Sequence, residues 1–176
     1  LVMSHENEEI RLSGSLRDST YKDFKMEFDN VDISKITPEI DNLYLGGTLN
    51  GKLDLLQENG AYYPNTALEI QDLKINKDRM GNLVIDVDGN ENLTSYSINA
   101  SIRKEEFESL NAIGNIDVSG IEPSIDLDVD LQKLNLSAFS PLGGEVLNSM
   151  RGSATGNAKI RGNYKNPEFS GQLSLN

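Results

Sequence analysis

The chain of 176 residues has no cysteine and no tryptophan, and its only histidine is His5. Without cysteine it has no disulfide framework and no thiolate nucleophile. One histidine near the start of the chain supplies neither a histidine-based catalytic triad nor a histidine-based zinc site. The sequence therefore predicts a protein that is not an enzyme and that has no catalytic residues, metal or cofactor.

Basic residues and long apolar runs are also scarce. Sixteen Lys and Arg stand against 28 Asp and Glu, which gives a net charge of -12. Nucleic acids and anionic membranes both attract basic surfaces, so this charge argues against either as a partner. No apolar run approaches the ~18 residues that span a bilayer, and no signal peptide is visible. Because the sequence begins at Leu1 rather than at Met, we expect a segment of a longer protein.

Small or apolar residues alternate with polar ones in the stretch 152–162. The small or apolar positions are Gly152, Ala154, Gly156, Ala158, Ile160 and Gly162. A period of two predicts a strand with one set of side chains on each face of a sheet. Glycine in a strand often marks a place where a ligand or another backbone comes close. We interpret this face as a half-open apolar surface; the alternative is a glycine-rich strand under a tightly packed second layer.

Three segments share the pattern apolar-x-apolar-x-x-apolar-x-apolar: 26–33, 68–75 and 129–136. In each, the second apolar pair is out of phase with the first by one residue. A β-bulge at the intervening polar pair would return both to the same face. Two strands joined by a tight turn are the alternative, but none of the polar pairs is of the Asn-Gly type.

The first and third of these segments begin a longer repeat, with units at about 21–60 and 124–164. Each unit continues through a Ser- and Pro-containing stretch into a glycine-rich strand, so that Gly51 corresponds to Gly156. Internal repeats predict an elongated array whose units contact only their neighbours.

The remaining alternation predicts about ten long strands. We expect short helical turns at 37–40 and 140–150, and a short helix over 104–113 is an alternative to a strand there. Residues 1–8 are expected to form a flexible lead-in, and 9–176 one repeated β-groove segment. The predicted fold class is all-β: an elongated, strongly curved single sheet that forms a U-shaped groove.

The inward side chains of this groove are the candidate lipid-binding residues. They are Leu45, Leu49, Leu53, Leu55, Leu68, Ile70, Leu83, Ile85, Ile98, Ile102, Ile116, Leu127, Val129, Ala154, Ala158, Ile160 and Leu173. An ordinary core position is the alternative for each of them.

Two acidic patterns have a chemical interpretation as well as a structural one. Asp126, Asp128 and Asp130 alternate and thus share one strand face, where carboxylates attract a cation. The solvent face of a strand explains them better. Residues 86–90 match part of a calcium loop but lack its bidentate Glu, so a hairpin turn is favoured.

The order of these motifs resembles the TamB family of bacterial envelope proteins. The resemblance rests on the unit 28–33 leading to 45–51, its second copy at 131–136 and 150–162, and the tail 166–173. It implies a periplasmic segment of a protein anchored in the inner membrane elsewhere, with strands stacked into a taco-shaped sheet. It further implies phospholipid movement between the membranes and outer-membrane assembly. The full-length protein would work with a barrel protein of the TamA type, a contact not assigned to this segment.

Two functions follow as hypotheses. The first is a groove that holds and conducts phospholipid or other acyl chains, supporting outer-membrane assembly. The second is a structural β-sandwich or solenoid, a spacer or surface adhesin, with a filled core and no ligand.

Overall fold

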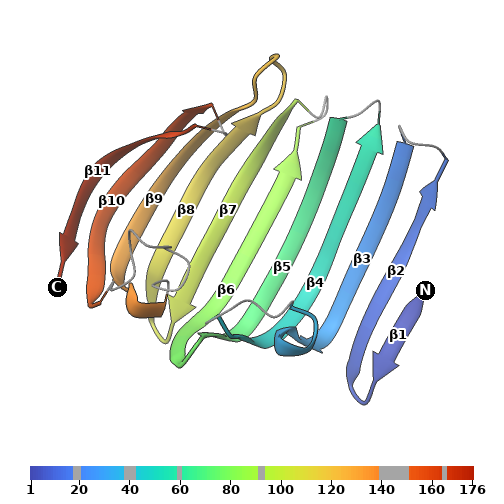
Figure 1. Ribbon diagram of the computed structural model, residues 1–176, viewed down its shortest axis with the longest axis horizontal. Helices are drawn as coiled ribbons and strands as arrows, with labels where there is room; N and C mark the ends of the chain where they lie inside the picture. The colour runs from blue at the N-terminus through green and yellow to red at the C-terminus, as the bar shows by residue number, and fades with distance from the viewer. Residues whose placement is uncertain (18–20, 38–42, 59–60, 91–93, 139–150, 164–165) are drawn as a thin grey trace.

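A computed structural model of residues 1–176 shows one antiparallel sheet of eleven strands in sequence order (Figure 1). It describes all residues except 18–20, 38–42, 59–60, 91–93, 139–150 and 164–165. The sheet is bowed and not closed into a barrel, and the two ends of the chain lie at its opposite edges. The predicted fold class is therefore confirmed. At a spacing of about 4.8 Å per strand, the sheet extends about 48 Å along its stacking direction.

Every strand pairs with its neighbours in the sequence. The strands are β1 (Val2–His5), β2 (Glu8–Leu16), β3 (Tyr21–Asp32), β4 (Leu45–Glu58), β5 (Ala61–Ile75), β6 (Asp78–Gly89), β7 (Ser95–Lys104), β8 (Phe107–Asp117), β9 (Ser124–Asn135), β10 (Ser153–Asn163) and β11 (Glu168–Leu175). A 3-10 helix, η1 (Ile33–Lys35), follows β3.

The three predicted bulges are present in β3, β5 and β9. The register shifts at each polar pair, and the second residue of each pair has a positive φ: 53° at Asn30, 52° at Asp72 and 49° at Lys133. A side chain of the next strand accepts a hydrogen bond from each of these backbone N–H groups. The acceptors are Asn50 Oδ1 (2.9 Å), Asn82 Oδ1 (3.0 Å) and Thr155 Oγ1 (3.0 Å). The same bulge, with the same kind of hydrogen bond from the next strand, thus occurs in three segments far apart in the chain.

The short elements differ in part from the sequence expectations. Residues 2–5, expected in a flexible lead-in, form β1 and pair with β2. The region 104–113 is the β7–β8 hairpin, so the alternative of a helix there is wrong. Most of the expected turn at 37–40 and all of that at 140–150 lie outside the described residues. No helix in the described ranges is long and apolar enough to cross a membrane.

The sheet buries little of its own surface. The chain exposes 11549 Å², whereas a compact protein of 19.4 kDa exposes about 8,500 Å². Among the described residues, no large side chain is completely buried. A filled sandwich core would bury many, so the apolar face lacks a second sheet over most of its length.

Candidate functional site: the apolar face of the sheet

The strand register places all the predicted lipid-binding residues on one face of the sheet. Directly paired residues share a face, and the pairs form rows that run across the strands. The rows, starting nearest the bulges, contain Leu49, Ile70, Leu83, Ile102 and Leu173; then Leu68, Ile85, Val129 and Ala158; then Leu53, Ile98, Leu127 and Ile160; then Leu55 and Ile116. Leu45 and Ala154 lie on the far side of the bulges. The bulges of β5 and β9 keep their partners, Ile75 and Leu134, in phase with the rest of the face.

The opposite face is almost entirely polar. Strand β9 shows the separation clearly, since Asp126, Asp128 and Asp130 alternate with half-buried Leu127 and Val129. The exceptions near the middle of the sheet include Val84 and Ile113. Polar side chains on one face and apolar ones on the other are typical of a sheet solvated on one side only.

The margin of the apolar face beside the bulges is a packed core. Its buried residues are Val31, Ile33, Leu49, Leu73, Ile75, Met80, Ile102, Leu134 and Ala138. Ile33 belongs to η1, which lies over this end of the sheet (Figure 1). Of the predicted lipid-binding residues, Leu49, Ile102 and Ala154 are buried here and present little surface to a ligand.

The chain after β9 covers a second part of the same margin. Ser137 Oγ lies 3.0 Å from Asp78 Oδ2 at the start of β6, so this segment reaches over β7 and β8. Asn135 Oδ1 accepts from Ser137 N (3.0 Å), as Asp32 Oδ1 accepts from Ser34 N (3.0 Å) at η1. The two repeat units thus close this margin with the same side-chain cap.

The rest of the face is open. Leu53, Leu55, Ile98 and Ile116 are half-buried there, and Leu173 on the edge strand β11 is 48% exposed. Two residues of the same rows are buried exceptions: Thr66 (8% exposed) and Tyr96 (2% exposed). The apolar face therefore has one closed margin and one open region, which together give an asymmetric groove.

The glycine-rich stretch in β10 has a structural explanation. Gly156 has φ 141°, and a Cβ atom there would overlap the backbone carbonyl of Gln172 in β11. Gly51 in the first repeat has φ 118° and would overlap the carbonyl of Ala67 in β5. The close approach suggested by the sequence is thus to a neighbouring backbone at both positions.

An ion pair between Lys35 and Glu8 connects η1 to the start of β2. Glu8 Oε2 accepts from Lys35 Nζ (2.8 Å), and Glu8 Oε1 accepts from Asp32 N (3.1 Å). The hydrogen bond from Lys35, and next that from Asp32, lower the pKa of Glu8, whereas Glu8 raises the pKa of Lys35. Glu8 and Lys35 bound a small pocket of about 140 Å³ with Met3, Ile10, Val31 and Ile36 among its walls.

The acidic residues of β9 pair with basic residues of β10. Asp128 Oδ1 lies 3.1 Å from Lys159 Nζ and 3.0 Å from Arg161 Nη2, and Arg161 also contacts Asp126. The hydrogen bond from Lys159, and next that from Arg161, lower the pKa of Asp128. Over the described residues no group of acidic or histidine side chains is arranged to hold a metal. The solvent-face interpretation of these carboxylates therefore fits their geometry.

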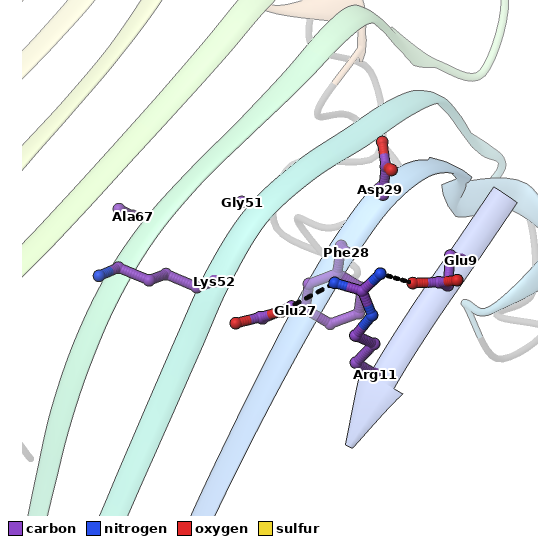
Figure 2. A pocket seen from close by; sticks show the side chains of 8 residues that line it. All are labelled: Glu9, Arg11, Glu27, Phe28, Asp29, Gly51, Lys52 and Ala67. Carbon is purple, nitrogen blue, oxygen red and sulfur yellow. Dashed lines mark ion pairs between the residues drawn. The ribbon is translucent and has the colours of Figure 1, made fainter. Parts of the chain in front are cut away.

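A pocket of about 430 Å³ lies at the strands β2 to β5, away from the open rows (Figure 2). Arg11 lies in it between Glu9 and Glu27, within 3.6 Å of the latter. Because Arg11, Glu9 and Glu27 pair with one another and are open to solvent, we assign no binding or catalytic site to this pocket.

Several residues of the apolar face were missing from the sequence-based set. The register adds Ile10, Leu12, Phe24, Met26, Phe28, Val87, Tyr96, Leu110, Ile125 and Leu131. The same period-two pattern marks them, so extending it to every strand would have found them. It also places polar residues on this face, among them Lys22, Gln57 and Thr66.

Comparison with known proteins identifies no relative: no family model, curated protein or solved structure matches this chain.

Proposed function

We propose that this chain is a groove segment that holds acyl chains of phospholipids along its apolar face and lets them move from strand to strand. The observation that carries the proposal is the uncovered apolar face of a sheet whose other face is polar and charged. Large exposed apolar surfaces are rare in monomeric proteins unless they bind something. A lipid whose tail lies on the rows and whose head group stays in water matches this division.

The energetics suit transient holding. Each methylene that leaves water contributes up to about 0.8 kcal/mol, so a few carbons on the Leu53 and Leu55 rows suffice for reversible binding. Apolar contacts have no preferred direction, and successive rows across the open region are chemically alike. A hydrocarbon tail can therefore shift along the rows without breaking a hydrogen bond.

The cellular setting is part of the same proposal. We place the segment in the periplasm, within an envelope protein of the TamB type that supports outer-membrane assembly. What supports this is the order of sequence motifs together with an open, one-sided sheet. The net charge of -12 keeps such a sheet soluble and makes copies of it repel one another.

The test is to purify the chain and look for bound phospholipid by native mass spectrometry. Protein ions carrying the added mass of one or more phospholipids, and protection of a fluorescent fatty acid, are expected. A ligand-free protein that also leaves the fatty acid in water would favour the structural spacer and overturn the proposal.

A further inference from the structure

Gln57 interrupts the apolar face near the open end of β4. It follows Leu53 and Leu55 at the same period of two, so its side chain belongs to the same face. It is only 7% exposed, and Oε1 is buried without a hydrogen-bond partner. No other buried side-chain nitrogen or oxygen in the described part of the chain lacks a partner.

The buried amide oxygen of Gln57 lacks the hydrogen-bond donors that water would give it. It can accept two hydrogen bonds, and burial without any costs free energy that a ligand donor would recover. Buried polar groups without partners are rare in proteins and call for an explanation. A ligand with an N–H or O–H group would supply one.

Lys22 lies beside Gln57 on the same face. The two residues are direct partners across β3 and β4, which places their Cβ atoms about 5 Å apart. Lys22 is half-buried, and no described carboxylate forms an ion pair with it. A cation that binds anionic oxygens thus stands next to an acceptor that lacks a donor.

We infer that Lys22 and Gln57 form a head-group subsite for phospholipids that carry both a phosphate and a hydrogen-bond donor. The phosphate pairs with the Lys22 ammonium group, the donor of phosphoethanolamine or phosphoglycerol reaches Gln57 Oε1, and the acyl chain lies on the adjoining Leu55 and Leu53. Phosphocholine has the same phosphate, but its quaternary nitrogen has no N–H to donate. This subsite rests on the proposed acyl-chain function and adds a head-group preference to it.

The experiment is displacement of a fluorescent fatty acid by lysophosphatidylethanolamine and by lysophosphatidylcholine with identical acyl chains. Because one hydrogen bond changes affinity by about threefold to tenfold, the ethanolamine lipid should displace the probe at a concentration lower by that factor. Gln57→Leu should reduce the ratio to one and leave the choline lipid unaffected. Gln57→Met, an unbranched replacement of similar length, guards against a shape effect of leucine.

Two further variants separate phosphate binding from general charge. Lys22→Met should weaken both lysophospholipids by the same factor and leave the preference between them intact. Lys25→Met is the control, because Lys25 lies in the same strand on the opposite face; it should change neither affinity.

The outcomes distinguish the subsite from the groove. If no probe binds, the acyl-chain function fails and the subsite with it. If both lipids bind equally well, or if both Gln57 variants keep the preference, the subsite is wrong while the groove stands.

Discussion

Gly156 occupies a backbone conformation that other residues rarely adopt. With φ at 141° and the carbonyl of Gln172 where a Cβ would lie, any side chain must push β11 away from β10. We predict that Gly156→Ala lowers the free energy of unfolding by about 2 kcal/mol or more, since strain of this kind costs about 1–3 kcal/mol before the overlap is added. Urea denaturation followed by circular dichroism measures it.

Gly120→Ala is the matched control. A Cβ at Gly120 would meet nothing closer than 3.7 Å, the oxygen of Glu122, and its φ is not positive. Its stability should change by less than about 0.5 kcal/mol. Equal effects of the two substitutions would show that the neighbouring strand does not constrain Gly156.

Lys133 is the least suitable residue among the three bulges. Asn30 and Asp72 hold the equivalent positions with φ near that of Lys133, and Asn and Asp tolerate the left-handed region better than Lys does. We predict that Lys133→Asn raises the free energy of unfolding by up to about 1 kcal/mol, measured by urea denaturation. Gln132→Asn, one residue earlier at a position without positive φ, should give no gain; a gain there would point to a cause other than backbone conformation.

At the scale of single residues, the sequence pattern predicted which face of the sheet a side chain lies on better than it predicted how deeply that side chain is buried. Alternation placed Leu49, Leu53 and Leu55 on the same face, as the register does. It could not separate the first, buried in the core, from the other two, because burial depends on η1 folding over that margin. The glycines had two sequence interpretations, ligand or backbone approach, and only the strand register distinguishes them.

At the scale of elements, each bulge depends on a side chain from the adjacent strand. Asn50 Oδ1 accepts from Asn30 N at 2.9 Å, and without it that N–H would face the outer side unpaired. We predict that Asn50→Ala lowers the free energy of unfolding by about 1 kcal/mol, the usual contribution of one hydrogen bond. Asn99→Ala, at an exposed mid-strand position of β7 with no bulge opposite, should change stability by less than about 0.5 kcal/mol; chemical denaturation of both variants compares them.

The link between η1 and β2 should depend on pH. Because Lys35 and Asp32 N lower the pKa of Glu8 from 4.5, the ionised Glu8 stabilises the fold above about pH 4.5, and this contribution is lost as the pH falls through the lowered pKa. The raised pKa of Lys35 gives a contribution that is lost only at strongly alkaline pH. We predict that wild type exceeds Glu8→Gln in Tm at pH 7 and that the difference shrinks at acid pH as Glu8 becomes protonated. Thermal melts at neutral and at acid pH measure it; a difference that is undiminished in acid would contradict an ionic origin.

The bulges were predictable from the sequence, but the side chains that accept hydrogen bonds from the bulge N–H groups were not. A bulge shifts the phase of apolar residues along the chain, and the pattern at 26–33 shows that shift directly. The acceptors Asn50, Asn82 and Thr155 lie on another strand, and a single sequence does not reveal strand register. The covering contact between Ser137 and Asp78 spans 59 positions and was invisible for the same reason.

At the scale of the whole molecule, the open region of the apolar face separates a conduit from a spacer. Strand order, antiparallel pairing and one-sidedness all follow from period-two alternation and turns between successive strands. The asymmetry of the groove does not follow, because it arises from two segments that fold back over one margin. A ligand thus has access from the side opposite the bulges, where Lys22 and Gln57 also lie.

Substitutions of Leu53 and Ile98 test whether lipid tails lie on the middle of the open region. Both lie in the same row of the open region, where an aspartate can reach water in the empty protein but would be covered by a bound tail. Because burying an unpaired carboxylate against hydrocarbon is strongly unfavourable, Leu53→Asp and Ile98→Asp should each reduce lipid loading at least about tenfold while the β-sheet circular dichroism persists. Val84→Asp is the control: it adds the same charge on the outer face, where Val84 is 36% exposed, and should leave loading unchanged. If Leu53→Asp and Ile98→Asp instead unfold the protein while Val84→Asp does not, then these side chains belong to a packed core, and the face that we propose for lipids is occupied by the protein itself.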